Sequence, residues 1–224
     1  MKTAPVVLSW SGGKDAAWTL HVLRSHGVKV VALLTTLTRD EQRVSMQGIR
    51  REVLHAQARA ARLSLVEAWI DPQCDNEAYE AAFSGALAAC AKQWPDVRTI
   101  AFGDLFLQDI RDYRAALCAR HGWDVETPLF GRDTGGLARE MIDAGLVAQV
   151  CCVDTTQLEA GFAGRRFDHS LLAELPASVD ACGENGEFHT CVSAGPMFAE
   201  PLAITRGDTV LSEGRFAYTE FLMA

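Results

Sequence analysis

The sequence predicts an α/β protein with a doubly wound parallel β-sheet. Short apolar runs of strand length alternate with longer segments of helical periodicity over the first half of the 224-residue chain. The first run, Val6-Val7-Leu8, is apolar at every position, as expected for a strand that is covered on both faces. The composition, 49% hydrophobic and 22% charged, is that of an ordinary globular protein that can bury a sizeable core.

The elements of the first half follow from these patterns. Strands are expected over residues 6–8, 28–35, 65–70 and 99–102, and helices over residues 16–26, 49–63, 79–94 and 108–121. The polar segment 36–48 is either a lid or a plain solvated loop. In the fourth helix, Ile110, Tyr113 and Leu117 are expected in the core, and Arg111, Asp112 and Arg114 on a solvated face.

The second half has a different character. Asp133 or Thr134 is placed to cap a helix that runs through Ala144. A strand is expected over residues 148–153, where two adjacent cysteines point to opposite faces and suit buried thiols better than a metal site. Residues 161–224 are rich in turns and end in a predicted β-hairpin.

A phosphate-binding loop is predicted between the first strand and the first helix. Gly12 and Gly13 lack side chains, so an anion can approach the backbone amides and the positive end of the helix. The expected ligand is a nucleotide phosphate. A Walker A loop is excluded because Leu8 and Asp15 occupy the positions that need Gly and Ser or Thr, and the G-x-G-x-x-G dinucleotide fingerprint is absent.

Three further segments carry candidate site residues. Leu34 and Thr35, at the carboxyl end of the second strand, are expected to meet the adenine. Gly103-Asp104 follows the fourth strand, and its carboxylate would either hold Mg²⁺ on the phosphates or cap the next helix. Residues 183–187 place two carboxylates around an Asn-Gly turn, which on its own is a hairpin signal with surface charges.

Charge and cysteine content limit the partners and the compartment. The formal net charge of -8 disfavours nucleic acid as a partner. Neither a secretory signal nor a stretch long enough to span a membrane is visible in the sequence. Seven cysteines without regular spacing argue against a disulfide framework, so we expect a reduced, cytoplasmic protein without membrane contact. The oligomeric state is not readable, and a homodimer is compatible with the sequence.

The motifs together resemble a known family. Residues 11–16, Ser-Gly-Gly-Lys-Asp-Ala, resemble the S-G-G-x-D-S pyrophosphate loop of the N-type ATP pyrophosphatases, with Ala16 in place of Ser. The whole chain resembles the diphthine–ammonia ligase family within that group. The resemblance also rests on Gly103-Asp104, on residues 140–146 (Glu-Met-Ile-Asp-Ala-Gly-Leu), and on residues 182–190, which are similar to the signature C-G-E-x-G-E-[FY]-x-T.

This resemblance implies a HUP-like Rossmann domain over residues 1–125 and a smaller α+β acceptor-binding domain over residues 126–224. It implies that ATP, with Mg²⁺, adenylates a carboxylate, which ammonia then converts into an amide with release of AMP and pyrophosphate. The implied catalytic residues are Lys14, Asp15, Glu184 and Glu187, and the implied Mg²⁺ ligands are Asp15 and Asp104. The implied nucleotide-binding residues are Ser9, Ser11, Gly12, Gly13, Lys14, Asp15, Ala16, Leu34, Thr35, Gly103 and Asp104. The implied acceptor-binding residues are Gly183, Glu184, Asn185, Gly186, Glu187 and His189.

Two other functions are compatible with a nucleotide loop of this kind. Related pyrophosphate-loop proteins insert sulfur into tRNA, but they commonly use paired cysteines and a basic surface, whereas this chain is acidic and has no C-x-x-C. A non-catalytic ATP- or AMP-binding module would share the fold but would not account for the acidic segment 182–190.

Overall fold

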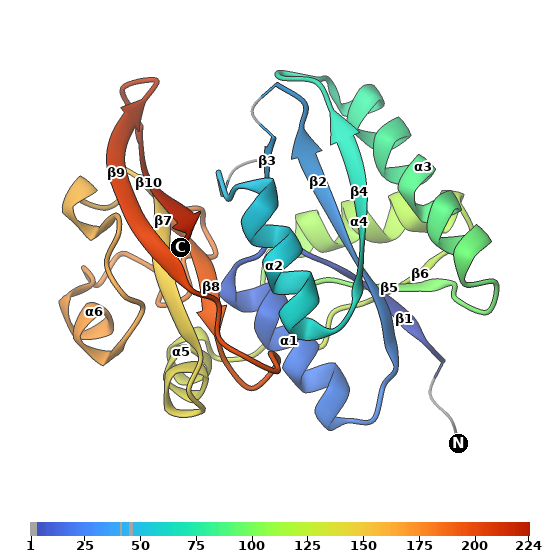
Figure 1. The fold of residues 1–224 in the computed structure, drawn as a ribbon, viewed down its shortest axis with the longest axis horizontal. Coiled ribbons are helices and arrows are strands. Elements are labelled where there is room, and N and C mark those ends of the chain that lie inside the picture. Colours follow the sequence, from blue (N-terminus) through green and yellow to red (C-terminus); the bar gives the residue numbers. More distant parts are fainter. Residues whose placement is uncertain (1–3, 41, 45–46) are drawn as a thin grey trace.

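The computed structural model describes residues 4–40, 42–44 and 47–224. Two β-sheets lie side by side, with helices between them and on their outer faces (Figure 1). In chain order the elements are β1 Val6–Ser9, α1 Lys14–Ser25, β2 Val30–Thr38, β3 Arg43–Val44, α2 Arg51–Ala61, β4 Ser64–Ile70, α3 Asn76–Gln93, β5 Thr99–Ala101, α4 Gln108–Arg120, β6 Asp124–Glu126, α5 Thr134–Asp143, β7 Val147–Asp154, η1 Ala160–Phe162, α6 His169–Glu174, β8 Phe188–Ala194, β9 Ile204–Ser212 and β10 Phe216–Met223.

The first sheet is doubly wound, as the sequence predicts. Its strands follow the order β3-β2-β1-β5-β6, and β4 also pairs with β2. All pairs are parallel except that of β2 with the short β3. The chain moves outward from β1 through β2 to β4, then returns to place β5 on the other side of β1. This reversal of strand order opens a crevice between the carboxyl ends of β1 and β5, the usual ligand position in such sheets.

Alternation along β1 explains how both faces of this sheet become covered. Val7 belongs to a buried cluster with Phe83 of α3 and Leu117 of α4. Val6 and Leu8 point to the opposite face and join the cluster that contains α1 and α2. Because successive side chains of a strand point to opposite sides, an all-apolar strand needs helices on both faces.

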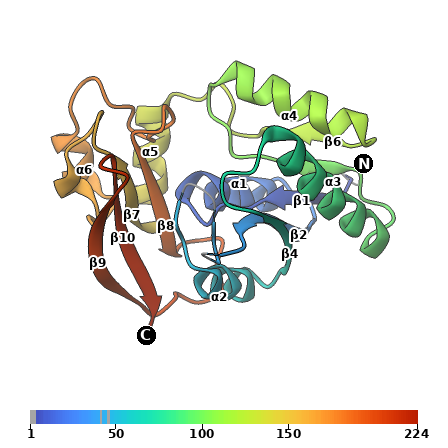
Figure 2. The same cartoon turned by 90° about the horizontal axis from the view of Figure 1, so that it is seen from above.

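The second sheet is antiparallel and has the order β8-β7-β10-β9. Helices α1 and α2 lie between the two sheets, where α1 contacts β8 and α2 contacts β10 (Figure 2). Helix α6 lies on the outer side of the second sheet, away from α1 and α2. Since one hydrophobic cluster includes residues from α1, α2 and the second sheet, the two halves of the chain share a core.

Some sequence expectations need correction. The predicted polar loop over residues 36–48 is partly sheet, because β2 continues to Thr38 and pairs with β3. Residues 41, 45 and 46 of that segment lie outside the described residues. Strands β6 and β8 and helix α6 were not predicted. The expected boundary between residues 125 and 126 falls within β6, and the division into two domains stays a prediction.

Helix α4 is oriented differently from the prediction. Ile110 and Tyr113 are exposed, at 38% and 39%, whereas Leu117 is buried as expected. Only the last turns of this helix reach the sheet, because its first turns lie at the edge where the crevice opens. Among the described residues, no helix is both long and apolar enough to cross a membrane.

Gln57 of α2 joins the first loop to the second sheet. Its side chain is fully buried and accepts a hydrogen bond from the Trp10 indole at 3.0 Å. Its amide nitrogen donates to the carbonyl oxygens of Gly12, at 3.0 Å, and Val192, at 2.8 Å. One side chain thereby satisfies three buried polar groups from β8 and the segment after β1.

We expect the substitution Gln57→Leu to lower the free energy of unfolding by about 2–4 kcal/mol, because it leaves buried polar groups without partners. Urea unfolding measures the change. Gln93→Leu, on the exposed end of α3, is the matched control and should change stability by less than about 0.5 kcal/mol. Equal stabilities of the two variants would contradict the role given to Gln57.

Candidate functional site

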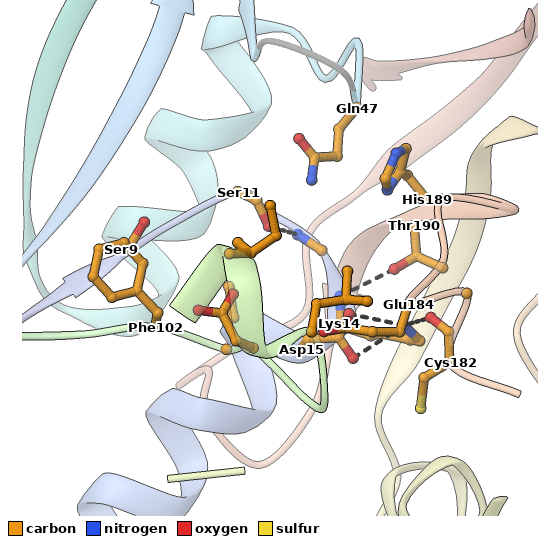
Figure 3. Close-up of a pocket in the computed structure, with 18 of the residues that line it drawn as sticks. Ser9, Ser11, Lys14, Asp15, Gln47, Phe102, Cys182, Glu184, His189 and Thr190 are labelled. Carbon is orange, nitrogen blue, oxygen red and sulfur yellow. Dashed lines mark hydrogen bonds and ion pairs between the residues drawn. The ribbon is translucent and has the colours of Figure 1, made fainter. Parts of the chain in front are cut away.

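A pocket of about 430 Å³ lies at the reversal of strand order, between the two sheets. It is formed where the segment after β1, the segment after β5 and the loop before β8 converge (Figure 3). Its lining includes Ser9, Ser11, Gly13, Lys14, Asp15, Ala16, Gln47, Phe102, Gly103, Asp104, Leu107, Ile110, Arg114, Cys182, Gly183, Glu184, Asn185, Gly186, Phe188, His189 and Thr190. The structure therefore brings together most of the residues predicted from three separate segments.

The loop after β1 is held by the second sheet as well as by itself. Gly12 has a φ of +80°, which favours glycine, and its carbonyl oxygen accepts from the Val192 amide at 3.0 Å. The Gly13 amide donates to the Ser11 hydroxyl at 3.3 Å, and the Lys14 amide donates to the Thr190 hydroxyl at 3.0 Å. Two amides near the start of α1 are thus engaged by protein groups.

The Lys14 side chain is buried, with only 2% exposure. Its ammonium group lies 2.8 Å from an Asp15 carboxylate oxygen and donates to the Cys182 carbonyl. It also lies 5.6 Å from the ring centre of Phe167 and 5.5 Å from that of Phe188. Burial lowers the pKa of Lys14, but the nearby acidic groups, Asp15 first, outweigh it and raise the pKa above 10.5. Lys14 is therefore protonated at neutral pH.

Asp104 lies on the opposite wall of the pocket. One carboxylate oxygen accepts from Arg114, whose guanidinium lies 4.6 Å from the ring centre of Phe102. The other oxygen is buried and has no hydrogen-bond partner among the described residues. The alternative that Asp104 caps α4 is wrong, because the N-cap residue is Leu107 and no side chain caps that helix. Arg114 was expected on a solvated face but lines the pocket instead.

Gly103 permits a close approach between the segment after β5 and the start of α1. A Cβ atom at this position would lie 2.9 Å from the Asp15 carbonyl carbon and 3.0 Å from the Ala16 amide nitrogen. These are backbone atoms, so a side chain would force the two segments apart. Gly103 thus sets the distance between the two walls.

Glu184 connects the loop before β8 to the segment after β5. Its carboxylate accepts from the Leu105 amide at 2.8 Å. Burial raises the pKa of Glu184 from 4.5 to about 6, with further upward contributions from Asp15 and Asp104. Lys14 and the Leu105 amide act in the opposite direction. Glu184 therefore changes protonation state close to neutral pH.

Other predicted residues have different positions. Glu187 is buried, does not line the pocket, and accepts hydrogen bonds from the backbone amides of Asp180 and Asn185. Leu34 and Thr35 are buried in the sheet and are not among the lining residues, and neither is Gly12. Their predicted contacts with substrate stay predictions.

Histidine and cysteine side chains in this region are not charged near neutral pH. Burial and the positive charge of Lys14 lower the pKa of His189 to about 4. Burial raises the pKa of Cys182 and of Cys191 to about 12.

The sequence did not predict a role in the site for several residues that line the pocket, which include Gln47, Phe102, Arg114, Phe188 and Thr190. Phe188 and Thr190 belong to the recognised segment 182–190 and could have been found from it.

Fold and site together define a Rossmann-like α/β protein whose pocket is completed by a smaller, antiparallel second part. Residues 133–218 match the family model described as the diphthamide synthase C-terminal domain. The chain is also 24% identical over 226 residues to "Diphthine--ammonia ligase" of Schizosaccharomyces pombe. That match covers 93% of this chain, and it spans only 37% of the length of the curated relative. Both similarities support the diphthine–ammonia ligase family that the motifs indicated.

We expect Gly103→Ala to lower the free energy of unfolding by about 1–3 kcal/mol, since the added methyl group meets backbone that cannot rotate away. Gly85→Ala is the matched control, because Gly85 lies within α3 with open space around it. The control should be more stable than the parent by about 0.5–1 kcal/mol. Thermal or urea unfolding distinguishes the two, and a stable Gly103→Ala protein would contradict the close approach.

Glu184→Gln should change the pH dependence of stability. Folding raises the pKa of Glu184 from 4.5 to about 6, so the protonated carboxyl is favoured in the folded state. The parent therefore loses stability from this group as pH rises through that interval. Because the amide cannot ionise, the variant should gain stability relative to the parent between pH 4.5 and about pH 6.

Urea unfolding at a series of pH values measures this difference. Glu77→Gln, at an exposed position in the first turn of α3, is the control and should give a smaller pH-dependent difference. A pH-independent difference for Glu184→Gln would contradict the raised pKa.

Proposed function

We propose that the protein is an ATP-dependent amide ligase that adenylates a carboxylate and transfers it to ammonia. The carboxylate oxygen would attack the α-phosphorus of ATP, giving an acyl adenylate and pyrophosphate. Ammonia would then attack the acyl carbon, lose a proton and displace AMP, leaving the amide. The observation that carries this proposal is the convergence of the pyrophosphate-type loop, Gly103-Asp104 and the acidic loop before β8 in one pocket.

The walls of the pocket suit a triphosphate only if a further cation is present. Asp15, Asp104 and Glu184 face two cationic groups, Lys14 and Arg114. A triphosphate adds more negative charge, so it would be repelled unless some of that charge were neutralised. Mg²⁺ is the usual counterion of nucleotide phosphates, and it polarises the phosphoryl oxygens.

The residues present fit a Mg²⁺ ion that is held jointly with phosphate. Among the described residues, no group of three or more His, Cys, Asp or Glu side chains is arranged to hold a metal ion. Mg²⁺ needs no such cage, because it keeps several waters and binds one or two carboxylates together with phosphate oxygens. Asp104 offers a buried oxygen without a partner, whereas Asp15 is paired with Lys14. We therefore assign the main contact to Asp104 and a secondary one to Asp15.

Glu184 suits the ammonia half of the reaction. Ammonium has no lone pair and must lose a proton before it can attack. A carboxylate with a pKa of about 6 is ionised at neutral pH yet is a stronger base than an ordinary glutamate. Glu184 would hold ammonium by charge and accept the proton released during attack.

We propose that the acceptor, the molecule that becomes the amide, is a carboxylic acid. The name of the Schizosaccharomyces pombe relative refers to diphthine, and diphthine is therefore the first acid to assay. Sulfur transfer to tRNA finds less support, because Cys182 and Cys191 are buried and their pKa values are raised to about 12. Neither suits a thiolate nucleophile.

The proposal is tested by incubating the protein with ATP, Mg²⁺, ammonium and a panel of acids that includes diphthine. We expect AMP and pyrophosphate in equal amounts, and amide formation that requires ammonium. ADP and phosphate would contradict adenylation. Intact ATP across the whole panel would favour a binding module.

Asp104→Asn should lower the turnover number by about 10²–10³, the loss typical when one group that stabilises transition-state charge is removed. Raising the Mg²⁺ concentration should restore part of the activity if Asp104 contacts the ion. Asp124→Asn is the control, because Asp124 is exposed at the amino end of β6, away from the pocket. Equal turnover by the two variants would remove Asp104 from the mechanism.

A further inference from the structure

The ammonium group of Lys14 is fully engaged by protein groups. It is bound by the Asp15 carboxylate and the Cys182 carbonyl, and it lies over the neighbouring rings of Phe167 and Phe188. A lysine that serves as a phosphate ligand would instead hold its charge toward the open pocket. Moving this ammonium group to a phosphate would leave a buried carbonyl without its donor and separate a buried ion pair, which is costly.

We infer that Lys14 is a positioning residue that fastens the acidic loop 180–187 to the phosphate loop, and that it is not itself a ligand of the nucleotide phosphates. The inference rests on the proposed function and replaces the role that the sequence motif suggests for this lysine. In this assignment, the buried cation of Lys14 helps to fix the position of Glu184 relative to the phosphate loop.

The contacts of the acidic loop support this assignment. Within the loop, the Asp180 carboxylate accepts from the amides of Cys182, at 2.9 Å, and Glu184, at 3.2 Å. These bonds fix the shape of the loop but do not attach it to the first sheet. Its attachments to that part of the molecule are Lys14 to the Cys182 carbonyl and Glu184 to the Leu105 amide. Figure 3 shows Lys14, Asp15, Cys182 and Glu184 gathered at this point.

The second attachment depends on the first. Cys182 and Glu184 are two residues apart, so a shift at the Cys182 carbonyl moves the carboxylate that accepts from Leu105. The ion pair between Lys14 and Asp15, both in α1, holds the ammonium group beside the Cys182 carbonyl. Without Lys14, we expect the loop to open and Glu184 to lose its place beside Asp104.

Lys14 has a charge effect on Glu184 as well. The charged groups that face Glu184 are Asp15, Lys14 and Asp104, and it also accepts from the Leu105 amide. Lys14 lowers the pKa of Glu184.

The test uses Lys14→Met, whose unbranched apolar side chain can pack against the same two rings. Lys92→Met, at an exposed position near the end of α3, is the control. Hydrogen exchange of the amides of residues 180–187 is measured without nucleotide, and ATP affinity is measured without acceptor. We expect at least tenfold faster exchange in this loop and a Kd for ATP within threefold of the parent. Turnover should fall at least tenfold.

Unchanged exchange in residues 180–187, or a Kd for ATP raised more than threefold, would overturn the inference. Phe167→Leu provides a second test that does not depend on tolerance of the lysine substitution. The smaller side chain removes the ring that packs against Lys14. It should speed amide exchange in residues 180–187 without changing the affinity for ATP. If the parent protein makes no AMP and pyrophosphate, the proposed function fails, while the exchange measurements still decide the role of Lys14.

Discussion

The start of α1 is completed by groups from the far end of the chain. The Lys14 amide donates to the Thr190 hydroxyl, and the Gly12 carbonyl accepts from the Val192 amide. Helix ends leave amides and carbonyls that must find partners, and a buried group without one is costly. Here β8 supplies those partners. The phosphate-type loop and the second sheet therefore define each other's position, and the pocket exists because both are present.

The elements that the sequence predicted are those specified by local patterns. Strand β1 and helix α1 follow from apolar residues spaced within a few positions of each other. The cap of α5 was also readable, because the Asp133 carboxylate accepts from the Gly136 amide, three residues away, at 2.6 Å. The strands that were missed depend on distant partners. Strand β6, Asp124–Glu126, has charged residues at both ends and is specified mainly by pairing with β5.

The site was predictable as a set of segments but not as a set of side chains. Glu184 and Glu187 stand three residues apart in one acidic motif, and nothing in the sequence says which faces the pocket. Three-dimensional contacts separate them. Glu187 turns inward to accept from the Asp180 and Asn185 amides, whereas Glu184 reaches the Leu105 amide across the pocket. Arg114 was missed because a charged residue on a helix normally indicates a solvated face, and only the position of α4 beside the crevice changes that interpretation.

The family pattern has serine where this chain has Ala16, and the charged pair Asp104 and Arg114 lies on the opposite wall of the pocket. Ala16 lines the pocket without a hydroxyl donor, and the ammonium group of Lys14 is engaged elsewhere. In the proposed reaction, charge on the departing pyrophosphate must then be balanced mainly from the side of β5. Asp104 would hold Mg²⁺ through its unpartnered oxygen, while its other oxygen keeps Arg114 at the pocket wall. A chain that places its cations there depends less on a serine at position 16, because charge close to the phosphates stabilises them more strongly than one neutral hydroxyl.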